Sequence, residues 1–183
     1  MDEIRRRTLA VLVDNEAGVL SQVSRLFSRK GYNIESLAVG TTDSPMVSRI
    51  TIEVMADDHH ADLLCNQLRK MLPVHSVKQL TAEHSIRREL VLIKVRARNS
   101  ETRNEIIQVA NIFRGSIIDV SRETLTIAII GDETKTEAIQ RLLEEFGITE
   151  LVRTGVVALE RGRYTIDEDT KEKGEFNYGK NVL

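Results

Sequence analysis

The chain has 183 residues, a length that suits two small domains of roughly 100 residues each. Its 26 Lys and Arg against 28 Asp and Glu leave a net charge of −2, which argues against a dedicated nucleic-acid binder. The single cysteine excludes an internal disulfide framework and every Cys-pair zinc or redox motif. No apolar run approaches a membrane span and the N-terminus shows no signal peptide, so we expect a soluble, cytoplasmic protein.

The first half of the chain alternates between strand-like and helix-like patterns. The expected elements are a strand at 7–13, a helix from 19 to 30 ended by Gly31, strands at 32–39 and 46–55, a helix capped by Asp57 or Asp58 and stopped by Pro73, and a strand at 74–80. This βαββαβ order is typical of ferredoxin-like folds.

The second half repeats the same order. The expected elements are a strand at 89–97, a helix capped by Asn99 or Ser100 and ended by Arg114 and Gly115, strands at 116–120 and 125–130, a helix with a capping box of Thr134 and Glu137, and a last strand within 148–159. We therefore predict an α+β protein of two tandem βαββαβ ferredoxin-like domains.

These patterns set the expected boundaries. The first domain spans 1–80, a short polar linker spans 81–88, and the second domain spans 89–162. Residues 163–183 lose all periodicity and are rich in charge, so we expect a polar, flexible tail. The tail also holds Tyr164, Phe176 and Tyr178, which leaves open a segment that becomes ordered on a partner.

The usual catalytic motifs are missing. The sequence has no phosphate loop, dinucleotide fingerprint, zinc-protease motif or nucleophile elbow. His59 and His60 are adjacent and cannot share one helix face, so we expect surface histidines and no metal site. Cys65 lies on an apolar helix stripe and is expected to be an inert core residue. The arginines at 5–7 are interpreted as a solvated strand entry, and no catalytic residue is expected.

An RNA-recognition module shares the βαββαβ order but stacks bases on aromatic side chains of its central strands. The corresponding strands here, at 46–55 and 125–130, contain no aromatic residue, which argues against RNA binding.

The loop from Asp14 to Gly18 is the best candidate for a binding site. It precedes a helix N-terminus, where free N–H groups and a partial positive charge favour an anion. Gly18 has no Cβ, so a carboxylate can approach the N–H groups of Gly18, Val19 and Leu20. The side-chain amides of Asn15 and Asn33 can bind an ammonium group. Together these groups suit a free amino acid, although an ordinary capped turn would need the same residues.

Two runs in this region carry a family resemblance. NEAGVL at 15–20 and KGYNIESL at 30–37 resemble the ACT domain of acetolactate synthase small subunits, and residues 111–120 and 153–159 resemble that family's second domain. The resemblance covers about residues 5–163. It implies a non-catalytic regulatory subunit that activates a separate large subunit and confers feedback inhibition, usually by valine. It also implies that thiamine diphosphate, Mg and FAD belong to the large subunit, and that this chain holds no cofactor.

The resemblance further implies a homodimer, with the effector at the interface of two paired ACT domains. Its effector-binding positions fall on Asn15, Gly18 and Asn33, with neighbouring contacts from Val19, Leu20 and Ile34. Two other functions remain open at this point: a free-standing ACT-type sensor that regulates another enzyme or transcription, and a small enzyme on the same scaffold.

The second domain differs at the matching positions. Thr102 stands where the first domain has Gly18, and Ile117 stands where it has Asn33. We therefore expect the second domain not to bind an amino acid, and to contact the large subunit or support the dimer.

Overall fold

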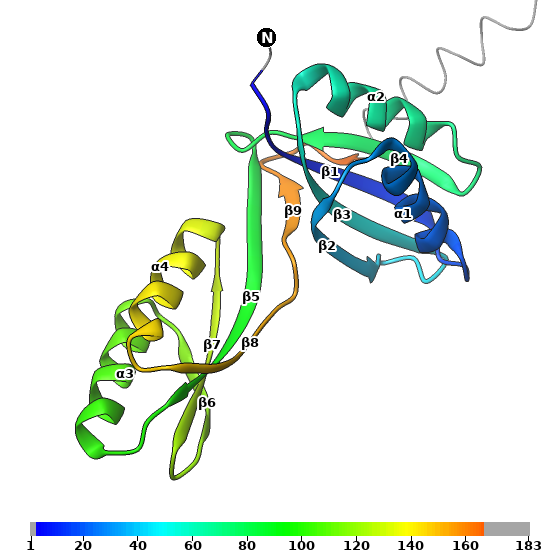
Figure 1. The fold of residues 1–183 in the computed structure, drawn as a ribbon. Coiled ribbons are helices and arrows are strands. Elements are labelled where there is room, and N and C mark those ends of the chain that lie inside the picture. Colours follow the sequence, from blue (N-terminus) through cyan, green and yellow to red (C-terminus); the bar gives the residue numbers. More distant parts are fainter. Residues whose placement is uncertain (1–2, 167–183) are drawn as a thin grey trace, which may run out of the picture. The chain divides into compact units, whose positions relative to one another are not determined.

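The computed structural model describes residues 3–166, which form two compact units of sheet and helix (Figure 1). One unit holds the chain up to Ile86 together with the segment from Val157, and the other holds Arg87–Val156. The sequence patterns predict a second domain that ends at residue 162. No helix among the described residues is long and apolar enough to cross a membrane.

The first unit has a four-stranded antiparallel sheet in the order β2-β3-β1-β4. Its elements are β1 (Arg5–Asp14), α1 (Val19–Lys30), β2 (Ile34–Thr41), β3 (Val47–Ala56), α2 (Asp58–Arg69) and β4 (Val74–Leu80). Both helices lie against one face of the sheet (Figure 1). Alternate strand residues such as Leu9, Ile52 and Val54 meet Phe27 and Leu64 there in a closed apolar core.

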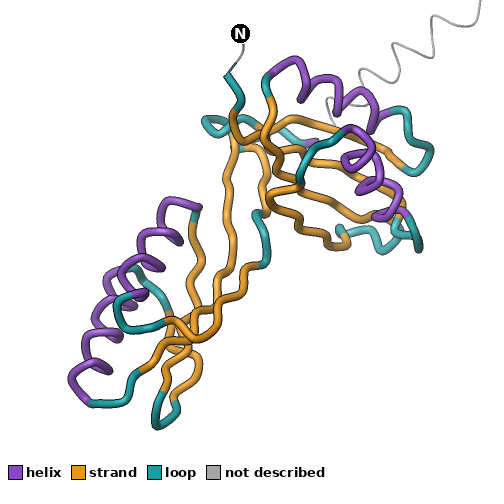
Figure 2. The backbone as a smooth tube through the Cα atoms, in the orientation of Figure 1, coloured by secondary structure: helices purple, strands orange, loops and turns teal. Residues whose placement is uncertain are grey.

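The second unit repeats this arrangement with strand order β6-β7-β5-β8. Its elements are β5 (Ser85–Arg96), α3 (Ser100–Ile112), β6 (Ser116–Val120), β7 (Thr124–Gly131), α4 (Glu133–Glu144) and β8 (Ile148–Arg153). Figure 2 shows the same layering of helices on one side of a sheet. Ile93, Ile127 and Ile139 are fully buried between the two layers. The predicted α+β class with two βαββαβ repeats is confirmed.

The region 148–159, which was expected to contain the last strand, holds all of β8 and the start of a further strand. Gly155, with a φ of 81°, lies in the interruption after β8, and the chain resumes as β9 (Val157–Glu160). β9 pairs with β5, whose first two residues belong to the first unit. A glycine with positive φ changes the chain direction at little cost, so the segment can leave the second unit here.

The segment from Val157 to Ile166 covers part of the first sheet on the face opposite its helices. Ala158 and Ile166 are buried there against Ala10, Leu12 and Leu80. The Arg49 guanidinium donates a 2.7 Å hydrogen bond to the Ala158 carbonyl. The expected polar tail, 163–183, therefore contains a packed residue, Ile166, and its part from 167 to 183 lies outside the described residues.

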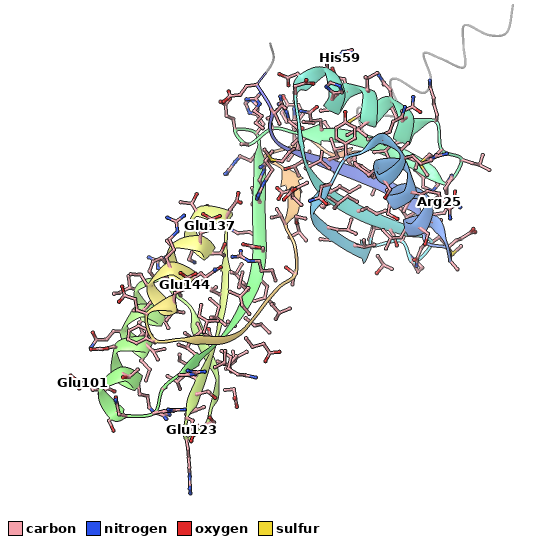
Figure 3. The ribbon with its side chains drawn as sticks, in the orientation of Figure 1. Arg25, His59, Glu101, Glu123, Glu137 and Glu144 are labelled. Carbon is pink, nitrogen blue, oxygen red and sulfur yellow. The ribbon has the colours of Figure 1, made fainter. Side chains whose placement is uncertain are left out.

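Helix caps explain where most of the helices begin. Asp57, Asn99 and Asp132 each accept a backbone N–H from the first turn of α2, α3 and α4. The capping box predicted at Thr134 and Glu137 is therefore wrong, because Asp132 already caps α4 two residues earlier. Polar side chains such as Arg25, His59 and Glu144 project from the helices into solvent (Figure 3).

The arginines at 5–7 were interpreted as a solvated strand entry, but one of them is buried. Arg7 is only 6% exposed. Its guanidinium forms a 2.7 Å ion pair with Asp58 and donates to the Ala56 carbonyl at 3.2 Å. Arg7 therefore ties β1 to the start of α2, a contact 51 residues away in sequence that no local pattern could show.

Candidate functional site

The loop between β1 and α1 ends at a helix N-terminus that no side chain caps. Gly18 is the N-cap residue of α1, with a φ of 89°, and makes no side-chain cap hydrogen bond. A Cβ at this position would meet no atom within 4 Å. The first turn of a helix has N–H groups with no intrahelical acceptor, so this end of α1 is open to an anion.

The residues that follow Gly18 contribute differently. Val19 is 4% exposed and packs in the core, and its N–H donates to the Glu16 carbonyl at 3.4 Å. Leu20 is 41% exposed, so its side chain is available beside the open helix end. Gly18 and Leu20 thus remain the better backbone donors of the three predicted, and Leu20 adds apolar surface.

Asn15 is tied to the turn between β2 and β3. Its backbone N–H donates to the Met46 carbonyl at 2.8 Å, and its side-chain Nδ2 donates to the Pro45 carbonyl at 2.9 Å. Its Oδ1 accepts a 3.0 Å hydrogen bond from the Ser48 hydroxyl. The side chain predicted to bind a ligand is therefore also held by the protein at both ends of its amide.

The other side of the loop is braced as well. The Asp14 backbone N–H donates to the Pro73 carbonyl at 2.9 Å, and the Asp14 carboxylate lies 2.7 Å from Nε2 of His75. The loop is thus held between the turn that precedes β3 and the turn that precedes β4. Both contacts join residues about 30 to 60 positions apart, so local sequence patterns carry no signal for them.

Asn33 and Ile34 lie at the opposite end of the unit. Ile34 pairs with Val54 on β3, and Val54 also pairs with Arg7 at the start of β1. The Asn15 end of the sheet is instead marked by Ser48, which pairs with Val13 and Thr41. Six residues of β3 separate the two levels, or about 20 Å at a strand rise of ~3.3 Å.

The structure therefore brings Asn15, Gly18, Val19 and Leu20 together but places Asn33 and Ile34 apart from them. Asn33 is exposed, and its Nδ2 donates to the Glu35 carboxylate at 2.8 Å. The 12 residues of α1 run between the two groups. A single copy of the first unit cannot place both groups on one small molecule.

Tyr32, the residue before Asn33, has a shifted pKa. Burial raises the pKa of the Tyr32 hydroxyl, and the negative charge of Asp57 raises it further. The pKa of Asp57 itself is lowered, first by the hydrogen bond from the His60 backbone N–H and then by the His60 side chain. Tyr32 is therefore held neutral beside an ionised helix cap.

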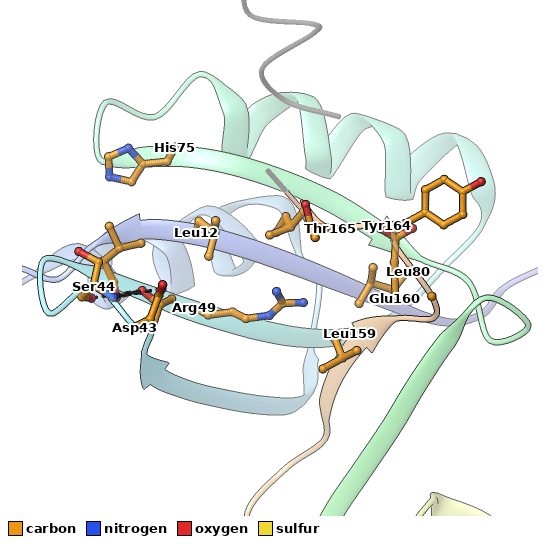
Figure 4. A pocket seen from close by; sticks show the side chains of 14 residues that line it. Leu12, Asp43, Ser44, Arg49, His75, Leu80, Leu159, Glu160, Tyr164 and Thr165 are labelled. Atoms are coloured by element: carbon orange, nitrogen blue, oxygen red, sulfur yellow. Dashed lines mark hydrogen bonds between the residues drawn. The ribbon is translucent and has the colours of Figure 1, made fainter. Parts of the chain in front are cut away.

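A cavity of about 670 Å³ lies on the other face of the first sheet (Figure 4). Leu12, Arg49, Leu80, Leu159 and Tyr164 are among its lining residues. None of the six residues predicted to bind an effector lines it. No sequence pattern indicated this cavity, because β9 and the segment after it form one wall of it.

Comparisons with known proteins agree over both units. The profile described as "AHAS small subunit-like ACT domain" matches residues 9–76, and "Small subunit of acetolactate synthase" matches residues 88–162. The acetolactate synthase small subunit of Mycobacterium leprae is 48% identical over 85% of this chain and 91% of its own length. The probable acetolactate synthase small subunit of Archaeoglobus fulgidus is 48% identical over 86% of this chain and 98% of its own length.

A solved structure leads to the same family. The crystal structure of the acetolactate synthase small subunit from Thermotoga maritima superposes with a TM-score of 0.82 at 40% sequence identity, and covers 88% of this chain and 100% of that one. The family resemblance noted in the sequence is confirmed. The chain belongs to the family of acetolactate synthase small subunits.

Proposed function

We propose that this chain is the regulatory subunit of an acetolactate synthase in branched-chain amino-acid synthesis. It has no catalytic role itself, raises the activity of a separate large subunit, and makes that subunit sensitive to feedback inhibition by valine or a related amino acid. The observation that carries the proposal is the open N-terminus of α1 at Gly18. The N-termini of α2, α3 and α4 are instead each capped by the side chain of the N-cap residue.

The chemistry of an aliphatic amino acid suits this position. Its carboxylate is stabilised by the N–H groups and the partial positive charge of the α1 N-terminus. Its ammonium group needs oxygen acceptors, which the side-chain amides of Asn15 and Asn33 supply. Its hydrocarbon side chain can pack on Leu20 and on Ile34.

A dimer would bring the residues from Asn15 to Leu20 of one copy close to Asn33 and Ile34 of the other. Among the described residues, β2 is an edge strand with β3 as its only neighbour. Two β2 edges that pair antiparallel about a two-fold axis would reverse the direction of one strand relative to the other. The Asn33 end of one copy would then face the Gly18 end of the second, so each effector site would take residues from both copies.

The large subunit is the expected partner, and it supplies the catalysis. Thiamine diphosphate, Mg and FAD would be bound there and not by this chain. We place both proteins in the cytoplasm. Support for the partner comes from the family to which the chain belongs.

Co-expression with the large subunit tests this function. We expect the two proteins to purify together, acetolactate formation to rise when this chain is added to the large subunit, and valine to reduce that formation. Leucine and isoleucine are assayed in parallel. An amino-acid sensor for another enzyme would still bind valine but would neither purify with the large subunit nor raise its activity. Acetolactate formation by this chain alone would contradict the proposal.

A further inference from the structure

Ser48 is a buried polar residue at the edge of the candidate effector site. It is 7% exposed and lies near the start of β3, on the face of the sheet that carries α1. Its hydroxyl donates a 3.0 Å hydrogen bond to Oδ1 of Asn15, a residue 33 positions earlier in the chain. No pattern in the sequence had singled it out.

The two contacts of the Asn15 side chain define which way its amide faces. The Pro45 carbonyl can only accept, so the amide atom 2.9 Å from it must be the Nδ2 donor. This leaves Oδ1 facing Ser48, whose hydroxyl must then act as the donor. A flipped amide would place an oxygen against the Pro45 carbonyl and a nitrogen against Ser48. The orientation of Asn15 is therefore determined by its partners.

The same contacts limit what Asn15 can offer to a ligand. One N–H of Nδ2 is used by Pro45 and one acceptor site of Oδ1 is used by Ser48. A planar amide held at both ends keeps one N–H and one acceptor site, each with a fixed direction. Without the Ser48 hydroxyl, the amide could rotate, and a ligand would have to order it on binding.

We propose that Ser48 is a positioning residue for effector binding, acting through the side-chain amide of Asn15. This inference rests on the proposed function, because it assumes that Asn15 contacts the amino acid. The start of β3 and the turn before it would then take part in feedback inhibition. Ser48 itself does not touch the effector.

Ser48→Ala is the first test, made in the full chain reconstituted with the large subunit. A hydrogen bond of this kind contributes roughly a factor of 5 to 10 in affinity. We expect the valine concentration for half-inhibition to rise by about that factor, while activation without valine is unchanged. Ser48→Thr keeps a hydroxyl and should stay within about twofold of the original chain. Ser24→Ala removes a hydroxyl that bonds only within α1 and serves as the matched control.

A double-substitution cycle distinguishes positioning from a general loss of structure. In a chain that already carries Asn15→Ala, the further change Ser48→Ala should leave the affinity for valine, measured by calorimetry, unaltered. The reason is that the amide through which Ser48 acts is already absent. Calorimetry on the chain alone also serves if a variant assembles poorly.

The failure of this inference can be told from the failure of the proposed function. Equal losses from Ser48→Ala in both backgrounds, or an unchanged inhibition curve when Asn15→Ala does shift it, would overturn the role of Ser48 alone. An original complex that ignores valine, leucine and isoleucine would overturn both.

Discussion

Gly18 combines two properties that a regulatory loop of this kind needs. Its φ of 89° lies in the left-handed region, which costs an L-amino acid roughly 1–2 kcal/mol. Its missing side chain leaves the α1 N-terminus accessible. Any replacement therefore introduces both strain and a side chain, and a single substitution cannot separate the two effects.

Gly18→Asp and Gly18→Asn form a matched pair at this residue. Both have nearly the same shape and both tolerate the left-handed region better than most residues. The aspartate adds a negative charge where the effector carboxylate would bind, so we expect inhibition by valine to be lost while activation of the large subunit survives. The asparagine should weaken inhibition less. Acetolactate formation across a valine titration measures both, and identical curves for the two variants would rule out the charge effect.

The same variant tests the second unit. Asn99 accepts the N–H of Thr102 and so caps α3 with the protein's own oxygen. Asn99, and not Thr102, therefore holds at α3 the N-cap position that Gly18 holds at α1. This helix end is closed, and we expect no binding of valine there. Calorimetry on the Gly18→Asp chain should show no residual heat of valine binding. A remaining isotherm would place a second effector site elsewhere in the chain.

Asp57 is one residue through which acid should lower the stability of the folded chain. Its pKa is lowered in the folded chain, chiefly by the hydrogen bond from the His60 backbone. A group with a lowered folded pKa stabilises the fold above its unfolded pKa, and this contribution is lost as the pH falls through the folded value. We expect the Asp57 carboxyl to titrate below the ordinary aspartate range by NMR. Asp57→Asn keeps the capping oxygen and should flatten the acid limb of the unfolding curve.

At the scale of elements, the hydrophobic periods predicted the fold better than they predicted the contacts within the site. Each helix and strand of the two repeats could be read because apolar residues recur at every second or every third to fourth position. The bonds from Asn15 to Pro45 and Ser48, and the pair of Arg7 with Asp58, join distant positions that only the completed sheet brings together. Asn15 and Asn33 were predicted to share one site, and α1 separates them within a single copy of the chain.

The edge strand β2 carries the predicted dimer. Val39 on β2 is 47% exposed, although Ile50, its partner on β3, is a core residue. Val39→Lys places a charge on this edge, a change that disfavours strand pairing. We expect a monomer by light scattering and a loss of valine binding, with the folded state retained. Leu72→Lys, at a fully exposed leucine, is the control and should remain dimeric. A Val39→Lys chain that stays dimeric would place the interface elsewhere.

On the scale of the whole molecule, the chain order and the division into units do not coincide. The chain builds the first unit, then the second, and then returns with β9 and Ile166 to cover the outer face of the first. The half-buried pair of Lys78 and Glu160, 2.6 Å apart, adds a charged contact to this return. Sequence periodicity could not show it, because four residues of strand fit equally well on either sheet.

Ile166→Ala measures what this return contributes to the first unit. Ile166 is 7% exposed and packs against Leu12 and Leu80 across the sheet, and loss of a buried isoleucine typically costs about 2 kcal/mol or more. For a unit of this size that corresponds to a drop of about 10 °C in its melting temperature. Leu159→Ala removes a leucine that is 54% exposed in the same segment, and should change stability by less than about 0.5 kcal/mol.

Hydrogen exchange locates the effect of Ile166→Ala within the chain. Amides of β1 and β4 should lose protection, because their outer face depends on the returning segment, while those of β7 in the second unit should keep it. Equal loss in both units would mean that the segment stabilises the chain as a whole. Unchanged protection in β1 and β4 would show that the returning segment does not stabilise the first unit.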